Sequence, residues 1–327
     1  MKVLLTGANG FVGSHILDRL LELKLPTAIL LRAHSDRSFI TDHISKVEVR
    51  LGSMDHPSSL GATLDGITHV IHCAGATKAL SEAGFFAVNQ GGTRNLVEAI
   101  NQRGTLIERL LLVSSLAAAG PGTKDHPRHE HNDPKPVSAY GRSKLAAERE
   151  VVESCQVDWT IIRPPAVYGP RDREFLRLFK AAKCHMLPRF GGGRQELSLV
   201  YVTDLAAAIV AALTHANASR EIFFAGSPEV VTATELAQRI ATELKVQALP
   251  LPLPKAMLWF ACQWAELASK LTQKPNVLSA QKWPELKAPG WVCDVSKLRG
   301  EVGYDCRTSL ATGLAKTRAW YEAEGWL

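Results

Sequence analysis

The chain has 327 residues, slightly more than the about 250–300 at which a single core usually stops growing, so it fits one large domain or two unequal lobes. With 46% hydrophobic and 21% charged residues, the composition is that of a globular protein and excludes disordered, collagen-like and low-complexity chains. The net charge of +6 comes without a basic run or an aromatic-interleaved basic patch, so it indicates a phosphate-bearing ligand at least as well as a nucleic acid, which we do not expect as a partner.

The six cysteines are far apart and form no CxxC pair, which predicts buried thiols in a reducing compartment and neither disulfides nor a metal site. The opening MKVLLTG has the pattern of a strand followed by a glycine turn and not of a signal peptide. No stretch approaches the about 20 apolar residues that span a bilayer. We therefore expect a cytoplasmic protein without a membrane span.

In the first half, short apolar runs alternate with amphipathic stretches. The predicted strands are Lys2–Thr6, Thr27–Arg32, Lys46–Arg50, Thr68–Cys73, Arg109–Ser114 and Asp158–Arg163. The helical patterns are Phe11–Lys24, Glu82–Arg103 and Ser138–Glu153. Nearly continuous apolar strands alternating with helices indicate an α/β fold with a doubly wound parallel sheet, in which ligands bind beyond the carboxyl ends of the strands.

After Arg163 the alternation weakens. The pattern predicts helices at Glu174–Lys183 and Thr203–His215, a strand at Glu221–Phe224, a helix opened by a capping box at Thr232, and a rigid connector at Leu249–Pro254. We expect residues 1–165, with 200–226 returning to them, to form a nucleotide-binding domain. Residues 166–199 and 227–327 are then a smaller, interleaved substrate-binding lobe.

The segment Lys255–Thr272 predicts an apolar helix that carries Trp259, Phe260 and Trp264. Three interpretations stay open for it: part of the core, a lid over an apolar substrate, or a helix that lies on a membrane surface. Glu266 and Lys270 give it a polar face.

A glycine-rich turn follows the first predicted strand and opens the first helix. Gly7 permits a tight turn, Gly10 lets the backbone approach a pyrophosphate, and Gly13 lets helix and strand pack closely. The helix N-terminus attracts negative charge. The turn therefore predicts a dinucleotide site.

The end of the second predicted strand indicates which dinucleotide binds. An acidic residue there would hold a ribose 2′-hydroxyl, whereas an arginine accommodates a 2′-phosphate. The strand ends in Arg32, and the nearest acid, Asp36, lies too far into the loop. We expect NADP(H) to be favoured over NAD(H).

A candidate catalytic set follows the fifth strand. Ser115 comes at the strand end, and Tyr140 and Lys144 lie four residues apart on one face of the next helix. The lysine cation is expected to lower the tyrosine pKa below its reference of about 10, so that Tyr140 acts as general acid or base. The serine hydroxyl would polarise a substrate carbonyl.

These motifs resemble those of the extended short-chain dehydrogenase/reductase family, and the resemblance covers essentially the whole chain. The matching pieces are TGANGFVG (6–13), HCAGA (72–76), VNQGGTRNLVEA, VSS (113–115), YGRSK (140–144), RPPAVYGPRD (163–172) and YVTDLAAAI (201–209). The resemblance implies a Rossmann-type sheet and catalysis by Ser115, Tyr140 and Lys144. It also implies cofactor contacts from Gly7, Asn9, Gly10, Phe11, Val12, Gly13, Arg32, Ser53, Met54, Ala74, Gly75, Ala76, Asn89, Ser114, Tyr140, Lys144, Pro164 and Val167.

Some positions depart from the family pattern. Ser53 stands where an aspartate usually meets the adenine amino group, and Ala166 stands where nucleotide-sugar enzymes usually carry an asparagine. Arg32 and the apolar 255–272 segment look more like the branch of dihydroflavonol reductases and 3β-hydroxysteroid dehydrogenases. The resemblance therefore implies a reductase or dehydrogenase for a small apolar or aromatic substrate. A nucleotide-sugar epimerase or dehydratase and a non-catalytic NADP sensor stay open as alternatives.

The family resemblance also implies a homodimer formed through the helices predicted at 82–103 and 138–153. These helices carry the apolar residues Ala83, Phe86, Val97, Leu145, Val151 and Val152, more than one sheet face requires. A two-fold symmetric pairing is the commonest arrangement of this kind.

Overall fold

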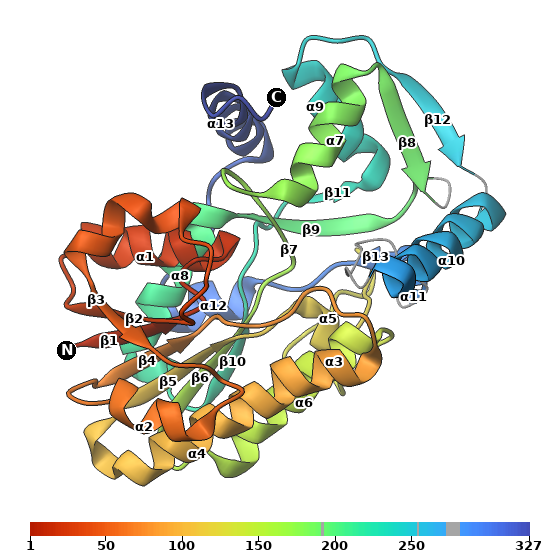
Figure 1. Ribbon diagram of the computed structural model, residues 1–327. Helices are drawn as coiled ribbons and strands as arrows, with labels where there is room; N and C mark the ends of the chain where they lie inside the picture. Colours follow the sequence, from red (N-terminus) through yellow and green to blue (C-terminus); the bar gives the residue numbers. More distant parts are fainter. Residues whose placement is uncertain (191–192, 254, 273–281) are drawn as a thin grey trace.

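A computed structural model describes residues 1–190, 193–253, 255–272 and 282–327 of the chain. Its main element is a seven-stranded sheet in the order β10-β6-β5-β4-β1-β2-β3, with every neighbouring pair parallel (Figure 1). The strands are β1 (Val3–Thr6), β2 (Thr27–Leu31), β3 (Glu48–Leu51), β4 (His69–His72), β5 (Arg109–Val113), β6 (Asp158–Arg163) and β10 (Glu221–Phe224). The strand order reverses between β1 and β4, which confirms the predicted doubly wound, Rossmann-type fold.

Helices cover both faces of this sheet. On one face, α1 (Phe11–Glu22) and α8 (Val202–Thr214) share a core with Leu5 and the other side chains of that face. On the opposite face, α4 (Gly92–Arg103) and α6 (Ala139–Ser154) pack on Leu4 and its neighbours. Because successive strand residues point to opposite faces and both faces are buried, β1, β2 and β5 consist almost entirely of apolar residues, whereas the edge strand β3 is partly exposed and carries Glu48 and Arg50.

The helix predicted at 82–103 has three parts. It begins as α3 (Glu82–Phe86), passes through a π-helical turn at Ala87–Gly91 and continues as α4. The extra residue in such a turn reorients the side chains around it, and π-turns are frequent at functional sites. Here the turn carries the buried Asn89.

A smaller lobe lies beside the carboxyl ends of the main strands (Figure 1). Its four-stranded sheet contains β7 (Ala166–Tyr168), β9 (Glu196–Tyr201), β11 (Val230–Thr232) and β13 (Gly290–Trp291). The helices α7 (Arg173–Lys183), α9 (Ala233–Glu243) and α13 (Leu310–Ala323) pack into one aromatic-rich core with it. The predicted capping box is present, since Thr232 Oγ1 accepts from Glu235 N at 3.1 Å and Glu235 Oε2 accepts from Thr232 N at 2.7 Å.

The prediction of a connector at Leu249–Pro254 is wrong, because most of it is strand. β12 (Leu249–Leu253) pairs in parallel with β8 (Met186–Phe190), with Leu249 opposite Met186. Alternating prolines lack every second N–H donor, so this strand suits only an edge with one partner. It leads towards α10 (Lys255–Thr272), whose bounds are those predicted.

Four short helices complete the elements that bear on the site: α2 (Leu60–Thr63), α5 (Leu116–Ala119), α11 (Trp283–Lys287) and α12 (Ser296–Val302). Among the helices of the described residues, none has both the length and the apolar character required to cross a membrane.

Candidate active site

A pocket of about 320 Å³ opens at the carboxyl ends of β1, β2 and β4. The strand ends and the loops that follow them supply its walls, as expected for the switch point of a doubly wound sheet. Its lining residues are Thr6, Gly7, Asn9, Gly10, Leu30, Arg32, Ser35, Gly52, Ser53, Met54, Asp55, Cys73, Ala74, Gly75 and Val88.

The glycine turn has the geometry that a dinucleotide requires. Gly7 has φ +72°, and a Cβ added at Gly13 would lie 2.0 Å from the Gly7 carbonyl oxygen, so a side chain at Gly13 is excluded. Gly10 caps α1, whose first turn, containing Phe11 and Val12, has no acidic residue. The helix N-terminus therefore presents its N–H groups and positive dipole end to an anion, and no acidic side chain in the first turn competes for them.

The wall beyond β2 carries Arg32 and Ser35. Arg32 N donates to Ser35 Oγ at 3.2 Å, and Ser35 N donates to the Arg32 carbonyl at 3.1 Å, so a tight turn brings both side chains to the pocket. Asp36 is turned to other partners: its carbonyl accepts from Asn9 Nδ2 at 2.9 Å and its carboxylate from Ser38 N at 2.9 Å. The pocket wall at this strand end thus offers a cation and a hydroxyl.

Asp55 is a pocket residue that the sequence reasoning missed. It lies two positions after Ser53, and its backbone N–H donates to Ser53 Oγ at 3.3 Å. Both residues line the pocket beyond β3, with Met54 between them. The sequence signal was an acid, Asp55, two residues after Ser53, the position where the family usually has an aspartate. The turn at Ser53–Asp55 brings Asp55 to the same wall of the pocket as Ser53.

Ser115 and Tyr140 meet at the carboxyl end of β5. Ser115 is the N-cap of α5 and accepts from Ala117 N at 3.1 Å, and Tyr140 lies in the first turn of α6, which Ser138 caps. The two side chains are near enough that the Ser115 hydroxyl lowers the pKa of Tyr140. Two helix N-termini thus bring a serine and a tyrosine hydroxyl to one point.

Lys144 is buried one turn after Tyr140, and its Nζ donates to the carbonyl oxygen of Val113 on β5 at 2.8 Å. A Cβ added at Gly75 would lie 3.8 Å from this Nζ and 3.0 Å from Asn89 Oδ1, so the lysine borders the dinucleotide pocket. Asn89 bridges the pocket to α6, since its amide pairs twice with the Ala76 backbone at 2.8 and 3.1 Å and donates to Ser143 Oγ at 2.9 Å.

Burial, together with the charge of Glu285, raises the pKa of Tyr140 to about 12, while the interaction with Ser115 opposes the shift. The predicted lowering by Lys144 is therefore wrong for this arrangement. The ammonium is engaged by Val113, and burial lowers the pKa of Lys144 itself. Tyr140 is a protonated hydroxyl at neutral pH and is suited to donate a proton.

Two charged residues near Tyr140 come from far along the chain. Lys282 Nζ lies 5.7 Å from the centre of the Tyr140 ring and donates to Glu285 Oε2 at 2.9 Å. The second carboxylate oxygen of Glu285 is buried and has no hydrogen-bond partner among the described residues. No motif in the sequence marks these residues, because only the packing of the smaller lobe brings α11 to the site.

Ser114 faces away from Ser115 into a buried ion pair. Its hydroxyl donates to Glu148, which also accepts two hydrogen bonds from Arg163 at 2.9 and 2.6 Å. After Arg163, the Pro164 carbonyl accepts from Leu116 N at 2.8 Å, and Val167 packs against the main core from β7. These residues fix the chain around Ser115.

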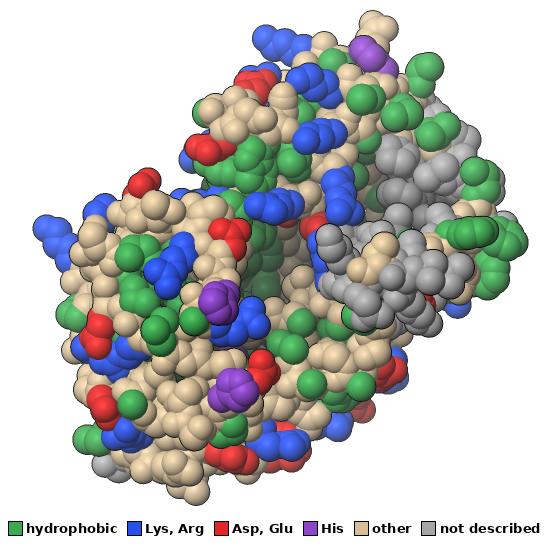
Figure 2. Space-filling model, in the orientation of Figure 1, with side chains coloured by type: hydrophobic (Ala, Val, Ile, Leu, Met, Phe, Trp, Pro, Cys, Tyr) green, Lys and Arg blue, Asp and Glu red, His purple; other side chains and the backbone are tan. Residues whose placement is uncertain are grey.

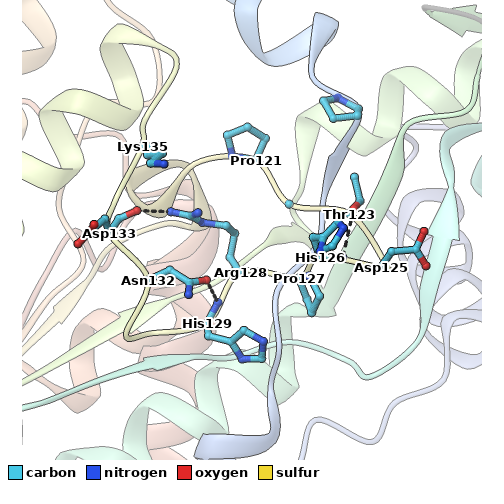
Figure 3. A pocket seen from close by; sticks show the side chains of 12 residues that line it. Pro121, Thr123, Asp125, His126, Pro127, Arg128, His129, Asn132, Asp133 and Lys135 are labelled. Carbon is cyan, nitrogen blue, oxygen red and sulfur yellow. Dashed lines mark hydrogen bonds between the residues drawn. The ribbon is translucent and has the colours of Figure 1, made fainter.

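The loop after α5, which carries His126, His129 and His131, forms a separate pocket of about 690 Å³ (Figure 3). Its lining residues are Pro121, Gly122, Thr123, Asp125, His126, Pro127, Arg128, His129, Asn132, Asp133, Lys135 and Pro289. Arg128 donates to the carbonyl oxygens of Ala119 and Asp133, and the rings of His129 and His131 stack at 5.3 Å. The part of the chain that the structure describes contains no group of three or more His, Cys, Asp or Glu residues placed to hold a metal ion.

Figure 2 shows a hollow between the sheet domain and the smaller lobe, with Lys and Arg side chains around its rim.

Comparison with known proteins agrees with this geometry. A model of the NAD dependent epimerase/dehydratase family matches residues 3–226. The chain is 31% identical to a ceramide reductase of Caulobacter vibrioides over 99% of this chain and 96% of the relative, and 27% identical to a UDP-glucose 4-epimerase of Vibrio cholerae over 77% and 79%. The structure of Thermus thermophilus UDP-glucose 4-epimerase in complex with NAD is similar in fold, with a TM-score of 0.78 at 24% identity and coverage of 98% and 99%. The chain belongs to the NAD dependent epimerase/dehydratase family, and it is an NAD(P)-dependent enzyme that acts on CH–OH or C=O groups.

Proposed function

We propose that this protein is an NADP-dependent oxidoreductase that reduces a ketone or aldehyde of an apolar substrate, or oxidises the corresponding alcohol. The observation that carries the proposal is the meeting of Ser115 and Tyr140 at the end of β5, with Lys144 between them and the dinucleotide pocket. NADPH supplies the hydride when it is bound.

The chain's own residues have distinct tasks in this reaction. Ser115 donates a hydrogen bond to the substrate oxygen and orients the carbonyl. Tyr140, protonated at neutral pH because its pKa is raised to about 12, delivers the proton to that oxygen. Lys144, held by Val113, presents a buried positive charge at the border of the pocket and would bind the nicotinamide ribose.

The preference for NADP(H) over NAD(H) is part of the proposal. Arg32 and Ser35 would hold the 2′-phosphate, while the N-terminus of α1 and the glycine turn would hold the pyrophosphate. Ser53, Met54 and Asp55 face the adenine end. Ala74, Gly75, Ala76 and Asn89, together with Pro164 and Val167 beyond β6, would enclose the nicotinamide end.

The apolar substrate class is supported by the ceramide reductase, whose named substrate is a lipid. We propose that residues 166–199 and 227–327 bind this substrate beside the nucleotide-binding domain of residues 1–165 and 200–226. The reacting carbonyl would bind at Tyr140, next to Lys282 and Glu285.

An epimerase is the second candidate, because the Vibrio cholerae relative is a UDP-glucose 4-epimerase. One experiment separates the two functions. Purified protein is incubated with NADPH and a panel of long-chain ketones, aryl ketones and aldehydes, and separately with UDP-glucose and NAD⁺ or NADP⁺. A reductase oxidises NADPH in proportion to the alcohol formed, whereas an epimerase changes the sugar without net consumption of cofactor. Binding of NADPH without turnover of any compound would instead indicate a sensor.

We also propose a homodimer formed through residues 82–103 (α3, the π-turn and α4) and α6, and a cytoplasmic location. The free thiols of all six cysteines support a reducing compartment. The dimer is supported by the exposed Val152 of α6, but Val97 and Val151 are buried in the core beneath the sheet and are not available to a partner. Light scattering at micromolar concentration tests the dimer.

A further inference from the structure

The exposed apolar side chains of this protein are concentrated at one end of the smaller lobe. Among the described residues, 13 large hydrophobic side chains are exposed, and seven of these lie on only three elements, β8, β12 and α10. The other six are scattered singly over the rest of the surface, as is normal for a soluble domain. A concentration of this kind marks an interaction site.

The helix α10 exposes the apolar stripe that an amphipathic helix usually buries. Met257, Phe260 and Trp264 are spaced by three and four residues, so they lie on one face, and they are 58%, 57% and 68% exposed. Cys262, on the opposite face, is fully buried. The helix therefore packs on the lobe through its Cys262 face, and the Phe260 face stays exposed among the residues that the structure describes.

The two strands that precede this helix extend the same surface. Leu249 and Leu251 are two residues apart, so they share a face of β12, and they are 77% and 45% exposed. Met186, paired with Leu249 across the ladder, is 46% exposed. Figure 1 places β8, β12 and α10 along the outer edge of the lobe, and Figure 2 shows hydrophobic side chains along that edge.

Positive charge flanks the apolar residues. Lys180 and Lys183 lie in the last turn of α7, just before β8, and Lys245 lies just before β12; all three are exposed. Because β8 and β12 run parallel from the Met186–Leu249 pair, these lysines lie at the same end of the edge. A row of aromatic and aliphatic side chains beside lysines complements a bilayer with anionic headgroups, into which tryptophan and phenylalanine insert at the interface.

We propose that the apolar edge, formed by Met186, Leu249, Leu251, Met257, Phe260 and Trp264, docks the protein on the surface of an anionic lipid bilayer. The helix α10 lies in the plane of the interface, and the flanking lysines face the headgroups. Of the three interpretations that the sequence left open for this helix, this is the membrane-surface one. The inference goes beyond the proposed function and does not depend on it.

The test is flotation of the purified full-length protein with vesicles of phosphatidylcholine and phosphatidylglycerol (3:1), without cofactor or substrate. The parent is expected to float with these vesicles and less with pure phosphatidylcholine. The double variant Phe260→Ser/Trp264→Ser should lose about tenfold or more of the bound fraction, and Lys180→Glu/Lys245→Glu should lose binding only to the anionic vesicles. Because these side chains are exposed, we expect unchanged circular dichroism and melting.

Two matched controls carry the same chemical changes elsewhere. Leu23→Ser/Leu106→Ser removes two hydrophobic side chains that are 44% and 68% exposed on the sheet domain, and Lys24→Glu/Lys46→Glu reverses two exposed charges there. Both should bind vesicles like the parent. Failure of the parent to float, or equal losses in the controls, overturns the inference. It is also overturned if the Phe260/Trp264 change converts a dimer to a monomer in light scattering while leaving flotation unchanged, because the edge then binds a second copy.

Discussion

Arg163 binds Glu148 through two parallel hydrogen bonds, Nε to Oε1 at 2.9 Å and Nη2 to Oε2 at 2.6 Å, where each side chain is only 3% exposed. Glu148 lies one helical turn after Lys144 on α6, and Ser114 donates to the same carboxylate. The pair therefore ties the helix that carries Tyr140 and Lys144 to the ends of β5 and β6.

Arg163→Leu should lower the free energy of unfolding by about 3–5 kcal/mol, because it leaves the Glu148 carboxylate buried without its cation. The control is Arg142→Leu on the same helix, which breaks an exposed pair with Glu82 and should cost at most about 1 kcal/mol. Urea unfolding measures both. Similar losses in the two variants would contradict the importance of burial here.

Tyr140→Phe removes only a hydroxyl and should lower kcat by a factor on the order of 10²–10⁴ without changing NADPH affinity. Ser115→Ala should lower kcat by less, since a water can replace the hydroxyl. Lys144→Met should weaken both NADPH binding and turnover, because the ammonium borders the pocket. Steady-state rates and fluorescence titration with NADPH separate these effects. Near-parental turnover in Tyr140→Phe would place the proton donor elsewhere.

Arg32→Asp should abolish or reverse the preference for NADP(H). Loss of a charge-assisted contact of about 1.5–3 kcal/mol corresponds to roughly tenfold or more in affinity. Arg37→Asp, which makes the same charge change at a residue that does not line the pocket, is the control. Calorimetric titration of NADP⁺ and NAD⁺ into each protein gives the ratio. Equal affinities of the parent for the two dinucleotides would refute the role of Arg32.

His72 makes stability depend on pH. It is buried between Thr6 Oγ1 at 2.8 Å and Thr93 Oγ1 at 3.0 Å, and burial, with the nearby Lys144 charge, lowers its pKa from 6.5 to about 3. Between those pH values the unfolded chain binds the extra proton, so the stability present above pH 6.5 is lost as the pH falls. The loss at pH 5 is about 2 kcal/mol. Urea unfolding at pH 7 and pH 5 should show a smaller difference in His72→Gln than in the parent.

Two glycines should respond oppositely to alanine. At Gly13 the new methyl would lie 2.0 Å from the Gly7 carbonyl oxygen, so Gly13→Ala should displace the turn and abolish dinucleotide binding. At Gly300, within α12, nothing lies within 4 Å, and Gly300→Ala should raise the free energy of unfolding by about 0.5–1 kcal/mol. Thermal melting with and without NADPH measures both. Normal ligand-induced stabilisation of Gly13→Ala would contradict the close packing of the turn.

Local patterns in the sequence were sufficient to predict the main sheet, the glycine turn and the placement of Tyr140 and Lys144 on one helix. Burial on both faces makes inner strands such as β1 and β2 nearly continuous apolar runs. A helix start after a strand needs specific residues such as Gly7 and Gly13. These requirements act within a few neighbouring residues, so they can be recognised in one sequence.

Only the tertiary structure decided the electrostatics of the site and the way in which the segments of the second half of the chain pack together. Burial raises the Tyr140 pKa, Lys144 binds Val113, and Lys282 and Glu285 reach Tyr140 from a distant helix. The pairing of β12 with β8 and the outward-facing stripe of α10 likewise depend on which segments pack together. The physical reason is the same in each case: periodicity is a local property of the chain, whereas burial and the charges around a group are set by residues far apart in sequence.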